Sequence, residues 1–143
     1  MAESTFSSQT AQSPGAQAET TVTVRYIVND VPASLEFYTK HLGFTVALDA
    51  SPRFAMVARG PLRLALSGVT GQGGGAQAMP DGRKPEPGGW NRIQISTSDL
   101  AAEVARLRAA GLHFRNDIVK GMGGSQILLD DPSGNPIELF QAH

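Results

Sequence analysis

The chain repeats one order of predicted elements twice, and this repeat restricts the fold more than any other feature of the sequence. In each half, a strand with alternating apolar residues precedes an aspartate typical of a helix N-cap, and the helix then ends at a glycine. Asp30 and Asp99 are 69 residues apart, and Gly43 and Gly111 follow them by 13 and 12 residues. The matching order and spacing predict two copies of one structural unit.

The first copy is predicted to occupy residues 21–68. Apolar residues alternate with others over 22–28, which is the period of a strand with one apolar face. Asp30 then caps a helix that ends at Gly43. Three further strand-like runs follow at 44–48, 54–58 and 62–66.

The second copy is predicted at residues 90–141. Ile93 and Ile95 alternate with polar residues, and a helix is expected between Asp99 and Gly111. Strand-like runs follow at 112–114, 126–129 and 137–140, with a turn over 131–136.

Two other segments lack this patterning. Residues 1–20 hold one aromatic and no basic residue, so we expect a disordered tail. From Gly68 to Gly89 there are eight glycines and three prolines, which predicts a linker over residues 69–89. Each copy therefore has the order βαβββ, and the predicted class is α+β, with two mixed sheets in a single domain over residues 21–143.

Composition excludes several classes of function. The chain has 12 basic and 13 acidic side chains, so we expect no broad attraction to nucleic acid or anionic membranes. It has no cysteine, which excludes disulfides, zinc-thiolate sites and thiol nucleophiles. No run is apolar enough for a membrane helix, and no signal peptide is recognised at the start, so a cytoplasmic protein is expected.

Several short motifs occur in a characteristic order: Val28-Asn29-Asp30, Phe37-Tyr38, Leu42-Gly43-Phe44 and the run DPSGNPIEL over residues 131–139. In this combination the chain resembles the vicinal oxygen chelate superfamily, also called the glyoxalase, bleomycin-resistance and dioxygenase family. The resemblance implies paired βαβββ modules whose sheets form a cup, commonly in a homodimer, with a small molecule bound on the concave face.

The resemblance also implies a divalent metal in those members that are enzymes, held by His, Gln or Glu of the modules' first and last strands. The corresponding positions here are Thr23, Arg92 and Glu138, with Arg63 or Ala65 in the strand over 62–66. An arginine cannot donate a lone pair to a metal. Only Glu138 matches a ligand, so no cofactor is expected, although a divalent metal stays possible.

We predict that an ion pair of Arg92 with Glu138 replaces the metal, since a guanidinium can bind a carboxylate in bidentate geometry. Both are candidate catalytic residues, Glu138 as a base. Strand alternation and side-chain chemistry give the candidate ligand-binding residues: Thr23, Arg25, Phe54, Met56, Trp90, Gln94, Ser96 and Phe140.

Three functions stay open from the sequence. The first is a small-molecule-binding protein without the usual metal site, which sequesters or transforms an anionic or aromatic compound. The second is a metal-dependent lyase, isomerase or dioxygenase that uses Glu138 with Gln94 or His113. The third is a non-catalytic dimer in which Arg92 and Glu138 serve stability alone.

Overall fold

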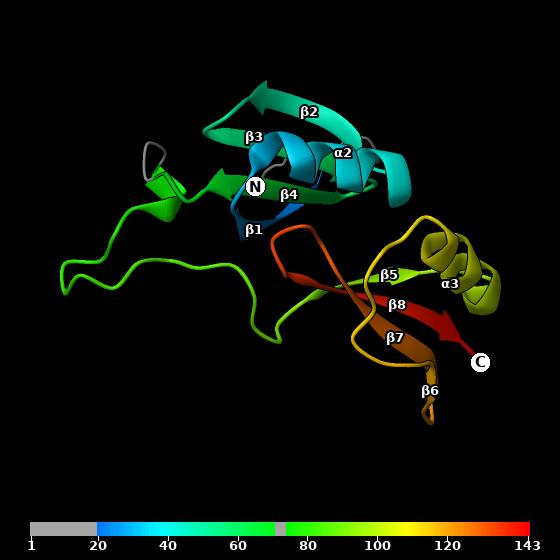
Figure 1. Ribbon diagram of the computed structural model, residues 1–143. Helices are drawn as coiled ribbons and strands as arrows, with labels where there is room; N and C mark the ends of the chain where they lie inside the picture. Colours follow the sequence, from blue (N-terminus) through cyan, green and yellow to red (C-terminus); the bar gives the residue numbers. More distant parts are fainter. Residues whose placement is uncertain (1–19, 71–73) are drawn as a thin grey trace, which may run out of the picture.

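A computed structural model describes residues 20–70 and 74–143 of the chain. The predicted tail over residues 1–20 lies outside the described residues except for Thr20. Two modules follow one another, and each is a four-stranded mixed sheet with one helix packed against it (Figure 1). The α+β class and the two βαβββ modules are therefore confirmed.

The first module contains β1, α2, β2, β3 and β4 in chain order. Their bounds are Val22–Val28, Val31–His41, Thr45–Ala50, Phe54–Arg59 and Leu62–Gly68. The strands lie in the order β1-β4-β3-β2, with β1 parallel to β4 and the other pairs antiparallel. Asp30 Oδ1 accepts a hydrogen bond from Ala33 N at 3.0 Å, which confirms the predicted cap of α2.

The second module contains β5, α3, β6, β7 and β8. Their bounds are Ile93–Ser96, Leu100–Ala109, Val119–Lys120, Gly124–Asp130 and Pro136–Ala142. The order β5-β8-β7-β6 repeats that of the first sheet, and β5 is parallel to β8. Between the modules, the described part of the linker contains one short 3-10 helix, η2, over Gly74–Ala76. No helix in 20–70 or 74–143 is long and apolar enough to cross a membrane.

The strand predicted at 112–114 is wrong. Only Phe114 forms an isolated bridge, to Leu129, and the fourth strand of this sheet is the two-residue β6 further along the chain. Pairing with β7 stops because the side chain of Asn116, through Oδ1, accepts the hydrogen bond of Leu128 N at 3.0 Å, where a strand carbonyl would otherwise accept it. The other predicted strands agree with the observed bounds within two residues.

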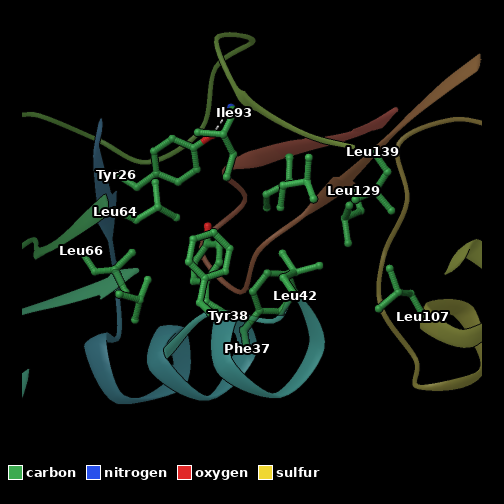
Figure 2. Packing of buried hydrophobic residues seen from close by; sticks show 14 of the residues in the cluster. Tyr26, Phe37, Tyr38, Leu42, Leu64, Leu66, Ile93, Leu107, Leu129 and Leu139 are labelled. Carbon is green, nitrogen blue, oxygen red and sulfur yellow. Dashed lines mark hydrogen bonds between the residues drawn. The ribbon is translucent and has the colours of Figure 1, made fainter. Parts of the chain in front are cut away.

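One core runs through both modules. The buried side chains of α2 belong to one hydrophobic cluster with buried residues of both sheets. In Figure 2, Tyr38 and Leu42 lie between Leu64 of the first sheet and Leu129 and Leu139 of the second. The modules therefore pack through the faces that carry their helices.

Buried hydrogen bonds join the modules at two tyrosines. Tyr26 Oη donates to the carbonyl of Pro136 at 2.8 Å and accepts from Ile93 N at 3.0 Å. Tyr38 Oη donates to Asp131 Oδ2 at 2.8 Å. Burial raises the pKa of Tyr26, and burial followed by the Asp131 carboxylate raises the pKa of Tyr38 well above its ordinary value. Both phenols therefore need to stay protonated in the folded chain.

The face of each sheet opposite its helix is called here the open face. Register places Thr23, Arg25, Phe54 and Met56 on the open face of the first sheet, whereas Tyr26 and Val28 face the core. On the second sheet, the open face carries Gln94, Ser96, Glu138, Phe140 and Leu128. The alternation predicted for β1 and β5 is confirmed, because the core-facing residues Ile93 and Ile95 are buried while Gln94 and Ser96 are exposed.

The two tyrosines predict the behaviour of the protein at alkaline pH. They are the only tyrosines of the chain, and their raised pKa values mean that the folded state holds the phenol protons more tightly than the unfolded state. Stability is thus fully present below the unfolded pKa of about 10 and falls as pH rises above it. We expect tyrosinate absorbance at 295 nm to appear only together with loss of the circular dichroism signal. Ionisation of the tyrosines at pH 10 in a protein that keeps its native circular dichroism signal would contradict this prediction.

Candidate functional site

The centre of the second open face is a carboxylate placed by strand register. Glu138 lies between Ile137 and Leu139, both buried in the core, so its side chain points to the opposite face. Parallel pairing of β5 with β8 sets Gln94 directly beside it. Arg92, just before β5, reaches the same carboxylate.

Glu138 uses both of its oxygens. Oε1 accepts hydrogen bonds from Arg92 Nε at 3.0 Å and Nη2 at 2.8 Å, and Oε2 accepts one from Gln94 Nε2 at 2.7 Å. The Glu138 side chain is only 8% exposed, and that of Arg92 is 28% exposed. A buried carboxylate is costly unless it is paired and hydrogen-bonded, and this one is both. The ion pair predicted from the sequence is present, whereas its role in catalysis remains a prediction.

The residues at this position do not fit a divalent metal. Thr23 and Arg92 occupy the positions at which the resemblance implies imidazole ligands, and the residue of β4 that pairs with Thr23 is Arg63. Arg63 donates to the carbonyls of Gly60 and Leu62. Within 20–70 and 74–143, no group of three His, Cys, Asp or Glu side chains is arranged to hold a metal ion. A single engaged carboxylate lacks the several donors that give a metal site its affinity.

Gln94 and His113 are the two residues considered as metal ligands beside Glu138, and neither is placed to act with it. Gln94 turns its amide nitrogen to the carboxylate. The side chain of His113 is 76% exposed, and its Nε2 lies 3.7 Å from Asp130 Oδ2. The other histidines, His41 and His143, lie at the end of α2 and at the last residue of the chain.

The open face of the first sheet holds a second group of the predicted residues. Arg25 and Phe54 line a cavity of about 530 Å³ together with Arg53, Ser67 and three glycines, Gly68, Gly74 and Gly75. Arg25 Nη1 donates to Ser67 Oγ at 2.8 Å. Met56 is on this face in register with Ala65, and Thr23 lies at the outer end of β1, but neither lines the cavity.

Trp90 lies at the surface beside the Arg92–Glu138 pair. It is 69% exposed, and the guanidinium of Arg115 is 4.8 Å from the centre of its ring. Its carbonyl accepts a hydrogen bond from Arg92 Nη1 at 3.2 Å. Arg115 is in turn held by Asp130, at 2.6 Å. The indole is therefore fixed by cation–π contact next to the Arg92–Glu138 pair.

The remaining predicted residues of the second open face are Ser96 and Phe140, which pair with each other two positions beyond Gln94 and Glu138. Ser96 lines a smaller cavity of about 200 Å³ between the modules, with Thr97 and Arg106. The ring of Phe140 covers Gly124, where a Cβ atom would come within 2.7 Å of the Phe140 ring. Thr23 and Met56 lie on the first sheet, so the predicted residues are divided between the two open faces.

A further cavity of about 310 Å³ connects the two groups. Arg25 and Arg92 both line it, together with Glu86 and Asn91 of the segment that precedes β5. Arg53, Ser67 and Glu86 were not among the residues predicted for the site. Arg53 directly precedes Phe54, which was predicted for the site, and Ser67 continues the alternation of β4 one residue beyond its predicted end. The sequence pattern could therefore have indicated both residues. No sequence pattern indicated that the linker would approach the first sheet.

Comparison with known proteins places this geometry in a family. The sequence profile of the Glyoxalase/Bleomycin resistance protein/Dioxygenase superfamily matches residues 20–139. No curated protein matches the chain by sequence. A superfamily member from Sphaerobacter thermophilus DSM 20745 is 26% identical, with a TM-score of 0.67, covering 85% of this chain and 95% of its own.

Two other solved structures show that different functions share the fold. TnmS3, an antibiotic binding protein from Streptomyces sp. CB03234, is 24% identical, with a TM-score of 0.65, covering 86% of this chain and 95% of its own. Lactoylglutathione lyase from Agrobacterium tumefaciens is 17% identical, with a TM-score of 0.66 and coverage of 84% and 91%. The fold therefore accommodates both a binding protein and an enzyme, and the side chains must decide between them.

The burial of Glu138 predicts the effect of removing its partner. Arg92→Met leaves the carboxylate without a cation, and we expect a loss of about 1–3 kcal/mol in the free energy of unfolding, measured by urea denaturation. The double variant Arg92→Met/Glu138→Leu should recover most of this loss. Arg83→Met is the matched control, since its pair with Asp81 is exposed and should contribute less than about 0.5 kcal/mol. Equal stability of Arg92→Met and the parent chain would contradict the prediction.

Proposed function

The chain belongs to the Glyoxalase/Bleomycin resistance protein/Dioxygenase superfamily, and we propose that it binds a small anionic or aromatic molecule without a divalent metal held by the protein. The observation that carries the proposal is the engagement of Glu138. Its two oxygens accept three hydrogen bonds from Arg92 and Gln94, so a metal would have to displace a guanidinium that donates twice to Oε1 and an amide that donates to Oε2. The fixed positive charge of Arg92 takes the place that a cation would otherwise fill.

The open faces supply what a small-molecule site needs. Binding sites for small molecules are concave and mostly apolar, with a few polar groups that fix orientation. Here the cavity walls carry Phe54 on the first sheet, and Arg25 and Arg92 meet at the smaller cavity between the modules. Arg92 and Glu138 would orient a polar group of the bound molecule. If the protein also catalyses a reaction, Glu138 is the candidate base.

Metal content tests this proposal directly. The purified protein, dialysed against manganese, iron, cobalt, nickel or zinc and then against buffer, should hold well below one equivalent of metal per chain by elemental analysis. Glu138→Ala serves as the control and should leave this value unchanged. Near-stoichiometric metal that Glu138→Ala abolishes would instead assign the protein to the metal-dependent lyases, isomerases or dioxygenases.

We also propose that two chains associate through the open faces. Leu48 lies on the open face of the first sheet, on its edge strand β2, and is 52% exposed. Val119 lies on β6, the corresponding edge strand of the second sheet, and is 48% exposed. Within one chain the helix-bearing faces are used for packing between the modules, which leaves these apolar side chains uncovered.

The association predicts a dimer in solution. Sedimentation velocity should give twice the chain mass of 15.1 kDa, and Leu48→Glu should shift the equilibrium towards the monomer. Lys40→Glu, a charge change at an exposed residue of α2 on the helix-bearing side of the first sheet, is the control and should leave the dimer intact. A parent chain that stays monomeric at high micromolar concentration would contradict the proposal.

A further inference from the structure

The arginines of the chain divide into two groups. Arg83, Arg92, Arg106, Arg108 and Arg115 each have a carboxylate within 4.0 Å. In the part of the chain that the structure describes, no carboxylate lies within that distance of the other four, Arg25, Arg53, Arg59 and Arg63. Of these four, Arg25 and Arg53 line the same cavity of about 530 Å³.

The surroundings of this cavity leave its charge uncompensated. Residues 22–70 contain five basic and three acidic side chains. Asp30 caps α2, Asp49 accepts hydrogen bonds from Ser51, and Glu36 lies exposed on α2. None of these carboxylates lines the cavity, and its described lining contains no acidic residue. Glu86 of the linker lines the neighbouring cavity of about 310 Å³ together with Arg25, but it forms no ion pair with that guanidinium. The cavity therefore presents two positive charges to a ligand.

One of the two guanidinium groups is fixed in position. Arg25 Nη1 donates to Ser67 Oγ at 2.8 Å, and Ser67 is only 3% exposed. The linker passes directly over this contact, because a Cβ atom on Gly75 would overlap the guanidinium of Arg25. η2 contacts both β1 and β4 at this point. Arg25 is thus held between the sheet and the linker, which reduces the entropy lost when it binds an anion.

The other walls define the shape of the ligand. Phe54 is half-buried and presents its ring, and Gly74 and Gly75 present backbone without side chains. The volume lies within the range of about 300–1,000 Å³ found for small-molecule sites. A planar ring fits between an aromatic side chain and a glycine backbone, and a carboxylate on that ring would meet the guanidinium groups.

We infer that this cavity binds an aromatic carboxylic acid, with the carboxylate on Arg25 and Arg53 and the ring against Phe54. The inference rests on the proposed function and names the ligand class and the position within the fold. It places the ligand's charge on the first sheet, whereas Arg92 is already neutralised by Glu138.

Calorimetric titration with 2-naphthoate tests the inference. Two analogues separate charge from ring: 2-naphthalenemethanol lacks the carboxylate, and cyclohexanecarboxylate lacks the aromatic system. We expect 2-naphthoate to bind, and both analogues to bind at least about tenfold more weakly. Equal affinity for the neutral alcohol would overturn the assignment of the two arginines.

Variants of the chain then locate the site. Arg25→Gln and Arg53→Gln should each weaken 2-naphthoate binding by about tenfold or more. Arg63→Gln is the matched control. Arg63 is on the same open face, but it donates hydrogen bonds only to backbone carbonyls and does not line the cavity. The affinity of this variant for 2-naphthoate should change by less than about twofold. Circular dichroism confirms that each variant folds.

Failure of the inference is distinguishable from failure of the proposed function. Binding that survives both Arg25→Gln and Arg53→Gln but is lost in Arg92→Gln would overturn the inference and keep metal-free binding. Absence of 2-naphthoate binding to the folded parent chain would overturn the inference alone, since the metal content is measured separately. Stoichiometric metal would overturn the proposed function.

Discussion

The carboxylate of Asp131 is the contact on which the relation of the two modules depends. It is 4% exposed and accepts four hydrogen bonds, from Ser133 N, Asn135 N, Asn135 Nδ2 and the hydroxyl of Tyr38. Three of these donors belong to its own turn, and the fourth belongs to α2 of the other module. Because a buried carboxylate loses its hydration, it is stable only with such a complete set of donors. The turn and the helix are therefore fixed together.

The same turn continues the connection to β1. Asn135 Nδ2 donates to the carbonyl of Ile27 at 2.8 Å, and Ser133 Oγ accepts from Asn29 N at 2.8 Å. These bonds hold the helix-bearing faces of the modules against each other and leave the open faces outward. The sequence run that carries the family resemblance thus has two structural roles in this chain, since it builds the turn and also carries Glu138.

Local patterning predicted much of this structure, because alternation and caps depend on neighbouring residues. It gave the strand faces, the caps at Asp30 and Asp99, and the pair of Arg92 with Glu138. It failed at 112–114, where one asparagine side chain ends the pairing. It also could not separate paired from unpaired arginines. That distinction depends on contacts across long stretches of sequence, such as Arg25 with Ser67, 42 residues apart.

The exposure of residues 77–84 in the linker makes the chain accessible to cleavage there. The peptide bond after Arg83 lies in an exposed turn with no regular structure, so a protease of trypsin specificity could reach it. The bonds of Tyr26, Tyr38 and Asn135 between the modules do not involve that segment. A chain cut once at this position would remain a tight complex of two fragments. The protein is thus suited to be divided into two separately expressed halves that reassemble, at the cost of a concentration-dependent stability.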